Sequence, residues 1–290
     1  MKRLLYGLVA RGLLVGLTGP AKGQYTYTTV DVPGAVATFA SGINASGQIV
    51  GWYVAGGRNH GFLRAVDGSY STLDRPDANQ TIAYGINDAG QIVGLYGDAG
   101  GRPHGFLRDV DGSYTTIDVP GAYFTDGAYG INASGQIVGW FTDTGFRPHG
   151  FLRDVDGGYT TIDPPGASYS DAYGINDAGQ IVGVYYDGNT DHGFLRDVDG
   201  SYITLDVPGA ISTFAYGINN AGQIVGWYDD AGFRPHGFLR DVDGSYTTID
   251  VPGAYYGTTY AFGINASGQI VGNYTDTGGR EHGFLATPGG

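Results

Sequence analysis

Short apolar runs alternate with polar turns along nearly the whole chain, with the residue-by-residue alternation of β-strands. In residues 128–163 four such runs, at 128–132, 136–141, 149–154 and 159–163, are separated by turn sequences that include Asn-Ala-Ser-Gly and Asp-Gly. Apolar runs bounded by these turn residues predict antiparallel hairpins. No window keeps a helical period over about ten residues, so the pattern predicts an all-β protein.

The same four-run unit occurs six times. The phrase G-I-N recurs with its asparagine at 44, 87, 132, 176, 219 and 265, and H-G-F-L with its histidine at 60, 104, 149, 192, 236 and 282. Four antiparallel strands in about 44 residues are typical of one β-propeller blade. Residues 24–290 are therefore predicted to form a six-bladed β-propeller with four antiparallel strands per blade.

The two ends of this region predict how the ring closes. It begins with a fourth-strand phrase at 27–31 and finishes after a third strand at 282–285. The N-terminal strand can complete the last blade as its outermost strand, which leaves no open sheet between the ends. We expect this three-plus-one closure.

Residues 1–23 differ from the repeats. Lys2 and Arg3 precede an apolar stretch at 4–17, and Gly19-Pro20-Ala21 offers small residues for cleavage. This pattern favours a secretory signal peptide, and the stretch is too short for a membrane span, so no transmembrane span is predicted. The alternative is a retained N-terminal segment that anchors or docks the protein.

The repeat also resembles a known family. The phrase G-I-N-x-x-G-Q-I-V-G followed by a His-x-Phe unit is similar to the bacterial extracellular HAF-repeat family, with His-Gly-Phe here in place of His-Ala-Phe. The similarity covers essentially all of residues 24–290. It implies a bacterial protein that is secreted or at the cell surface, with a propeller-like fold, and it implies no catalytic residues.

Composition narrows the chemistry. The chain has 54 glycines, no cysteine and a net charge of −13, and Glu281 is its only glutamate. Without cysteine there can be no disulfide and no cysteine-ligated metal. An acidic chain is a poor partner for nucleic acid, and we expect none. Aspartate and glycine in this excess indicate tight turns, and no cofactor is predicted.

Residues present in all six copies are predicted to build the fold, because a catalytic group is needed only once. If Asp111-Gly112 forms a two-residue turn, Phe106 lies opposite Ile117 and Gly105 opposite Asp118, which brings His104 close to Asp118. Equivalent pairs are expected in every blade, as structural contacts between buried polar groups. The residues assigned this structural role are His60, His104, His149, His192, His236, His282, Asp118, Asp163, Asp206 and Asp250.

The Asp-x-Asp-Gly turns could begin a calcium loop, because paired carboxylates two residues apart are calcium ligands. The weak calcium candidates are Asp109, Asp111, Asp154 and Asp156. A third acidic ligand and a distal glutamate are missing from the spacing, so we favour a hairpin turn in which Asp-Gly supplies positive φ angles.

Function is expected where the copies differ, on one face and at the central channel. The residue before G-I-N changes from blade to blade, as does the residue after G-Q-I-V-G, and the loop after the second strand carries arginines. The predicted ligand-binding residues on this face are Tyr84, Tyr129, Tyr173, Tyr216, Phe262, Trp52, Trp140, Trp227, Arg147 and Arg234. Such rings suit the apolar face of a sugar, and the alternative is that they pack between blades.

Three functions remain open. The first is a non-enzymatic extracellular binding or scaffold module, with a polysaccharide or another cell-surface component as its partner. The second is a structural subunit that assembles with copies of itself into a filament or surface layer. The third, a hydrolase or lyase on one face, is the weakest, because the sequence shows no cysteine nucleophile, no glutamate pair and no histidine outside the repeated phrase.

Overall fold

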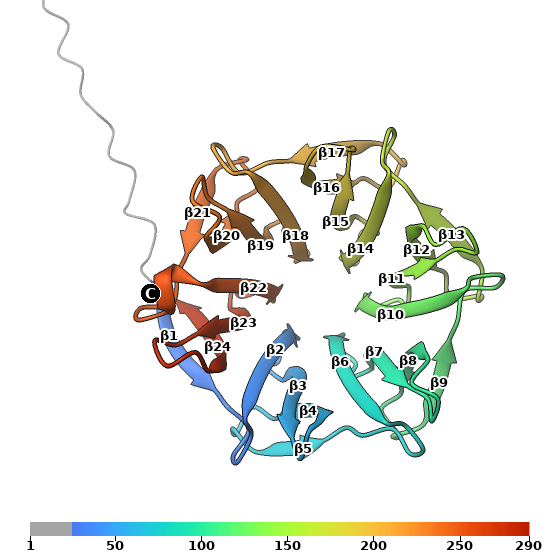
Figure 1. Cartoon of the computed structure of the whole chain (residues 1–290), viewed down its shortest axis with the longest axis horizontal. Coiled ribbons are helices and arrows are strands. Elements are labelled where there is room, and N and C mark those ends of the chain that lie inside the picture. Colours follow the sequence, from blue (N-terminus) through green and yellow to red (C-terminus); the bar gives the residue numbers. More distant parts are fainter. Residues whose placement is uncertain (1–24, 290) are drawn as a thin grey trace, which may run out of the picture.

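The computed structural model describes residues 25–289, which form six four-stranded antiparallel sheets arranged as blades around a central axis (Figure 1). The predicted six-bladed β-propeller is thus confirmed. The signal peptide or retained segment predicted at residues 1–23 lies outside the described residues. No helix in the described part of the chain is long and apolar enough to cross a membrane.

In every blade the strands follow one another from the axis outward. The first three blades are β2 (Ala37–Ile43), β3 (Ile49–Ala55), β4 (Arg58–Arg64) and β5 (Tyr70–Thr72); β6 (Gln80–Ile86), β7 (Ile92–Gly97), β8 (Pro103–Arg108) and β9 (Tyr114–Ile117); and β10 (Phe124–Ile131), β11 (Ile137–Thr142), β12 (Pro148–Arg153) and β13 (Tyr159–Ile162). The last three are β14 (Tyr169–Ile175), β15 (Ile181–Tyr186), β16 (Asp191–Arg196) and β17 (Tyr202–Leu205); β18 (Ser212–Ile218), β19 (Ile224–Asp229), β20 (Pro235–Arg240) and β21 (Tyr246–Ile249); and β22 (Thr259–Ile264), β23 (Ile270–Thr275), β24 (Glu281–Pro288) and β1 (Tyr25–Val30). One short 3-10 turn, η1 (Tyr255–Gly257), precedes β22.

The last blade joins the two ends of the described chain. Strand β1 pairs antiparallel with β24, so that Tyr25 lies opposite Pro288 and Val30 opposite Gly283. The sheet order β1-β24-β23-β22 confirms the three-plus-one closure (Figure 1).

Glycine is required where the inner strands of neighbouring blades meet. A Cβ atom on Gly130 of β10 would lie 2.7 Å from the carbonyl oxygen of Tyr173 in the next blade. The same approach crosses the ring closure, where a Cβ on Gly263 would lie 2.9 Å from the carbonyl oxygen of Ser41. Only glycine fits such close backbone contacts, so the glycine before each Ile-Asn lets six strands converge on one axis.

At one mouth of the channel the inner strands end in a ring of six buried asparagines, Asn44, Asn87, Asn132, Asn176, Asn219 and Asn265, which we call the asparagine ring. Each Nδ2 donates to the backbone carbonyl of the asparagine in the next blade, at 3.1–3.4 Å. The bond from Asn265 to Asn44 completes the circle. Each Oδ1 also accepts the amide of the glutamine four residues later, which fixes the turn between the first two strands; in blade 3 this bond is 3.0 Å long.

The predicted register of the outer hairpin is wrong by one residue. Gly105 pairs with Ile117 and Phe106 with Thr116, because Arg108 already pairs with Tyr114. The turn spans residues 109–113, and the Asp109 amide donates to the Ser113 carbonyl. Only Gly112 in this turn has positive φ, at 89°, so the turn is a type I turn with a glycine bulge rather than a two-residue turn.

Candidate functional site

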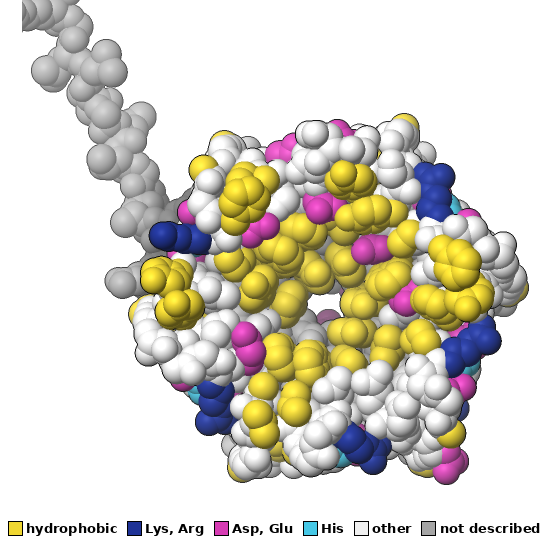
Figure 2. Space-filling view, viewed as in Figure 1, with side chains coloured by type: hydrophobic (Ala, Val, Ile, Leu, Met, Phe, Trp, Pro, Cys, Tyr) yellow, Lys and Arg dark blue, Asp and Glu magenta, His cyan; other side chains and the backbone are white. Residues whose placement is uncertain are grey.

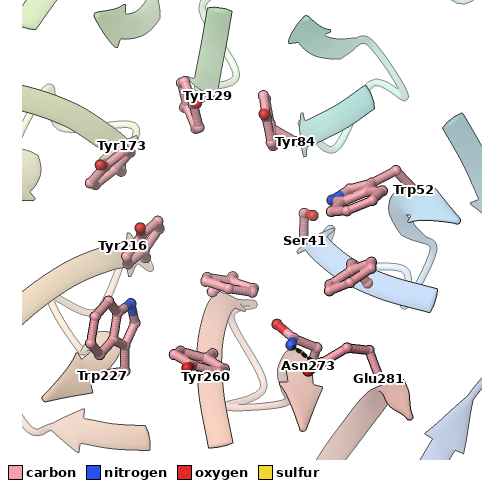
Figure 3. Close-up of a pocket in the computed structure, with 12 residues that line it drawn as sticks. Ser41, Trp52, Tyr84, Tyr129, Tyr173, Tyr216, Trp227, Tyr260, Asn273 and Glu281 are labelled. Carbon is pink, nitrogen blue, oxygen red and sulfur yellow. Dashed lines mark hydrogen bonds between the residues drawn. The ribbon is translucent and has the colours of Figure 1, made fainter. Parts of the chain in front are cut away.

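The residue before each G-I-N phrase projects into the channel at the mouth opposite the asparagine ring. These six residues, which we call the aromatic mouth, are Ser41, Tyr84, Tyr129, Tyr173, Tyr216 and Phe262. Together with Phe39, Trp52, Trp227, Tyr260, Asn273 and Glu281 they line one cavity of about 530 Å³, the aromatic cavity (Figure 3). Figure 2 shows hydrophobic side chains gathered around this central hollow. The volume is in the usual range for a small-molecule site.

The tyrosines of the aromatic mouth contact one another in pairs. The rings of Tyr84 and Tyr129 stack with centroids 4.1 Å apart, and those of Tyr173 and Tyr216 at 4.2 Å. Burial raises the pKa of all four hydroxyls, that of Tyr216 to about 12. At neutral pH they are therefore uncharged polar groups. The hydroxyl of Tyr173 already donates to Asp171.

Blade 1 breaks this circle, because Ser41 stands where the other five blades have an aromatic ring. Behind Ser41 the rings of Phe39 and Trp52 stack at 3.9 Å. On the same side of the cavity lie Asn273 and Glu281 of blade 6 (Figure 3). We call Ser41, Asn273 and Glu281 the polar wall of the cavity.

The carboxylate of Glu281 is held in place by two uncharged donors. Asn273 Nδ2 donates to Oε2 and Thr275 Oγ1 donates to Oε1, each at 2.7 Å. Glu281 is placed next to these donors by the β23–β24 ladder, in which it pairs with Thr275. Glu281 is the only charged residue among those that line the cavity.

Two further carboxyls lie on the inner strands of blades 3 and 4. Asp171 Oδ2 accepts the Tyr173 hydroxyl at 3.0 Å, whereas its buried Oδ1 has no hydrogen-bond partner among the described residues. Asp126 Oδ2 accepts the Thr142 hydroxyl at 2.9 Å. Burial raises the pKa of Asp171 to about 7 and that of Asp126 to about 6.

The other predicted binding residues do not line the cavity. Trp140 lies on β11 outside the lining set. Arg147 donates from Nε to the Ser168 carbonyl oxygen in the connection to the next blade. The guanidinium of Arg234 lies 5.3 Å from the ring centre of Tyr256. These two arginines therefore tie loops of neighbouring blades together at the edge of the face.

Sequence reasoning missed several lining residues. Phe39 and Tyr260 lie two positions before Ser41 and Phe262, so strand alternation would have placed each pair on one side of its strand. Glu281 stood out as the only glutamate, and Asn273 as the only amide after G-Q-I-V-G, but nothing local in the sequence brings these two residues to Ser41.

Each histidine contacts an aspartate between the third and outermost strands of its blade, in the pairs expected from the sequence. The Nδ1–carboxylate distances are 2.7–3.0 Å, for His60–Asp74, His104–Asp118, His149–Asp163, His192–Asp206, His236–Asp250 and His282–Asp31. The observed register explains the contact. Gly105 pairs with Ile117, so the next residues along the two strands, His104 and Asp118, face each other. All six pairs lie outside the lining of the aromatic cavity.

The calcium candidates act as turn caps. Asp111 Oδ1 accepts the Ser113 amide at 2.8 Å, and Asp156 Oδ1 accepts the Gly158 amide at 2.9 Å. Asp109 and Asp154 accept side-chain amides, from Gln91 at 3.4 Å and Gln136 at 2.7 Å respectively. Within residues 25–289, no three histidine, aspartate or glutamate side chains converge as a metal site.

The fold and cavity define a six-bladed β-propeller with an aromatic central cavity. Solved structures with a similar fold include a lactonase, a lectin and a lyase. A gluconolactonase from Xanthomonas campestris is 16% identical, with a TM-score of 0.53 and coverage of 91% of this chain and 90% of that one. The Aleuria aurantia lectin in complex with Fucα1-6GlcNAc is 14% identical, with a TM-score of 0.53 and coverage of 89% and 93%. Virginiamycin B lyase from Staphylococcus aureus is 14% identical, with a TM-score of 0.53 and coverage of 91% and 89%.

At these identities the likeness concerns the fold alone. No family model matches the chain, and no curated protein matches it.

Proposed function

We propose that the protein is an exported, non-enzymatic propeller that binds a glycan in the aromatic cavity. The observation that carries this proposal is that nine of the twelve residues lining the cavity are aromatic. Aromatic rings stack against the apolar faces of sugars, and a few polar groups between them fix orientation. The lectin neighbour, whose structure contains a bound glycan, supports the idea that this fold can serve such a function.

Export is proposed from the sequence of residues 1–23 and from the resemblance to the HAF-repeat family. N-terminal sequencing of the protein recovered from culture medium tests it, because cleavage near Ala21 would remove the leading segment. Electron microscopy of the same material tests the alternative of a self-assembling subunit, which predicts filaments or a surface layer.

The substitution Ser41→Tyr tests the cavity as the binding site. It copies into blade 1 the residue that four other blades carry, so the fold is expected to tolerate it, but its ring would fill the gap. We expect this variant to lose glycan binding, measured by the change in fluorescence of Trp52 and Trp227 on titration with glycan.

The matched control is Ala45→Asn, which copies Asn220 of blade 5 at the opposite mouth and should leave binding unchanged. Equal glycan affinity of Ser41→Tyr and the unmodified protein would show that the aromatic cavity is not the site.

A further inference from the structure

Three departures from the repeat meet on one side of the aromatic cavity. Five blades have an aromatic ring at the position of Ser41, and the other five have Trp, Leu or Val at the position of Asn273. The position of Glu281 is Asn59, Pro103, Pro148, Asp191 or Pro235 in the other blades. These three residues come from different strands of blades 1 and 6, yet together they form the polar wall (Figure 3).

The polar wall carries an uncompensated negative charge. Both oxygens of Glu281 accept hydrogen bonds from uncharged donors, at 2.7 Å. Among the residues that the structure describes, Glu281 forms no ion pair, and the cavity lining includes no lysine, arginine or histidine. A carboxylate held in this way is prepared for a cation that comes from outside the protein.

The other residues that line the cavity also favour a cation. The faces of aromatic rings carry partial negative charge and attract cations, most strongly where water is excluded. Rings from all six blades surround the cavity. The net charge of −13 adds a favourable long-range field for a cation.

We propose that the glycan bound in the aromatic cavity carries a protonated amino group, as in an amino sugar without its acetyl group, and that Glu281 receives the ammonium. This inference rests on the proposed glycan-binding function and names the class of sugar. The sugar ring stacks on the aromatic side chains while its ammonium group donates to the Glu281 carboxylate. A neutral sugar of the same size would gain the stacking but not the charged hydrogen bond.

The test compares three tetrasaccharides of β1-4-linked glucose type by isothermal titration calorimetry at pH 6, with the full chain. The first carries free amino groups, the second carries N-acetyl groups, and the third is the neutral glucose oligomer. We expect the amino form to bind at least about tenfold more tightly than the other two, and its advantage to shrink as salt is added.

The variant Glu281→Gln keeps the shape of the side chain and removes its charge. It should lose the preference, so that the amino form and the neutral oligomer bind the variant with affinities within about twofold of each other. Asn273→Val, which copies Val184 of blade 4, removes one donor to Glu281 and should weaken the preference only in part.

The outcomes separate this inference from the function on which it rests. Equal binding of all three oligomers, or a preference for the acetylated form, would overturn the amino-sugar assignment and leave glycan binding in place. Binding of none of the three, or of any other glycan on an array, would overturn both proposals. The comparison of ligands on the unmodified protein decides the question even if Glu281→Gln folds poorly.

Discussion

The two mouths of the central channel are formed by the same six inner strands, only three residues apart along the chain, yet they follow opposite rules. At the asparagine ring every blade has the same residue, and each side chain is bonded to the next blade. At the aromatic mouth the residue changes between blades, and the side chains leave a cavity of about 530 Å³.

The difference shows how a repeat protein can divide stability from binding. A circle of hydrogen bonds closes only if all six members are present, so variation at the asparagine ring would be costly in every blade. Side chains around a cavity have no such mutual requirement. Blade 1 can lose its ring at Ser41, and blade 6 can gain Glu281, without breaking a contact on which the other blades depend.

The largest expected effect on stability is at Gly130 of β10, which lies between the two mouths. In Gly130→Ala the new Cβ would lie 2.7 Å from the Tyr173 carbonyl oxygen and 2.9 Å from Val138 Cγ2. Such overpacking should lower the free energy of unfolding by about 3 kcal/mol or more, measured by chemical denaturation. Gly166→Ala is the control, because its φ of +84° is strained for alanine but nothing lies within 4 Å, so it should cost only about 1 kcal/mol.

Asn132→Ala should come next, with a loss of about 2 to 3 kcal/mol. The change leaves the Asn176 carbonyl and the Gln136 amide without their partners in a buried place, at about 1–3 kcal/mol for each unpaired group. Ligand affinity should stay unchanged. Thr144→Ala, in an exposed turn of the same blade, is the control and should alter stability by less than about 0.5 kcal/mol. An equal loss in both variants would contradict a special role for the ring.

Most of the fold could be predicted from the sequence because its signals are local and repeated six times. A turn such as Asn-Ala-Ser-Gly identifies its own hairpin, and the end strands identify the closure. The predicted register of the outer hairpin is wrong, also for a local reason. The pair Asp111-Gly112 predicts a two-residue turn, whereas Gly112 is the bulge residue that follows a type I turn.

The cavity could be predicted only in part. The aromatic mouth follows from one variable column in the repeat, which is why its five aromatic residues are predicted, whereas Ser41 is not among the predicted binding residues. Trp140 belongs to a column that is also variable, and Arg147 to one that is arginine in five of the six blades. Neither residue lines the cavity, since a column does not reveal where a side chain points. The polar wall joins Ser41 to Glu281, which are 240 positions apart, and only the closed ring brings them together.

Asp171→Asn tests the electrostatics of the aromatic side of the channel. The folded protein raises the pKa of Asp171 from 3.8 to about 7, chiefly by burial and with a contribution from Asp126 and Asp191. Between about pH 4 and pH 7 the folded state therefore binds more protons than the unfolded state, and stability contributed by this group falls as pH rises.

In Asp171→Asn this fall should disappear. The two proteins should be similarly stable near pH 4, and the variant should be more stable at pH 8 by on the order of 2 kcal/mol. This difference is smaller than the free energy obtained from the whole pKa change at about 1.4 kcal/mol for each pKa unit, because relaxation of the structure around the charged carboxylate reduces the cost of burying it. Asp199→Asn is the control, because hydrogen bonds from Ser201 lower the pKa of Asp199 and give a pH dependence of opposite sign. Identical pH profiles of Asp171→Asn and the unmodified protein would refute the burial of charge.

The smallest effect concerns the loops around the aromatic cavity. Phe146 has a φ of 63° at a turn position where two other blades have Gly101 and Gly279, with φ of 81° and 82°. Its side chain is 69% exposed, and the centre of its ring lies 4.9 Å from that of Tyr123. A left-handed backbone is unfavourable for phenylalanine, so Phe146→Gly should raise the free energy of unfolding by about 0.5 to 1 kcal/mol.

Phe146→Ala separates the two contributions, because it removes the ring and keeps the strain. If Phe146→Gly is more stable than both the alanine variant and the unmodified protein, an exposed ring is being kept at a cost to stability. Such a cost makes sense only on a face selected for contact with something else. If the glycine variant is instead less stable, the contact with Tyr123 outweighs the strain, and the loops of this face would be structural, like the asparagine ring at the opposite mouth.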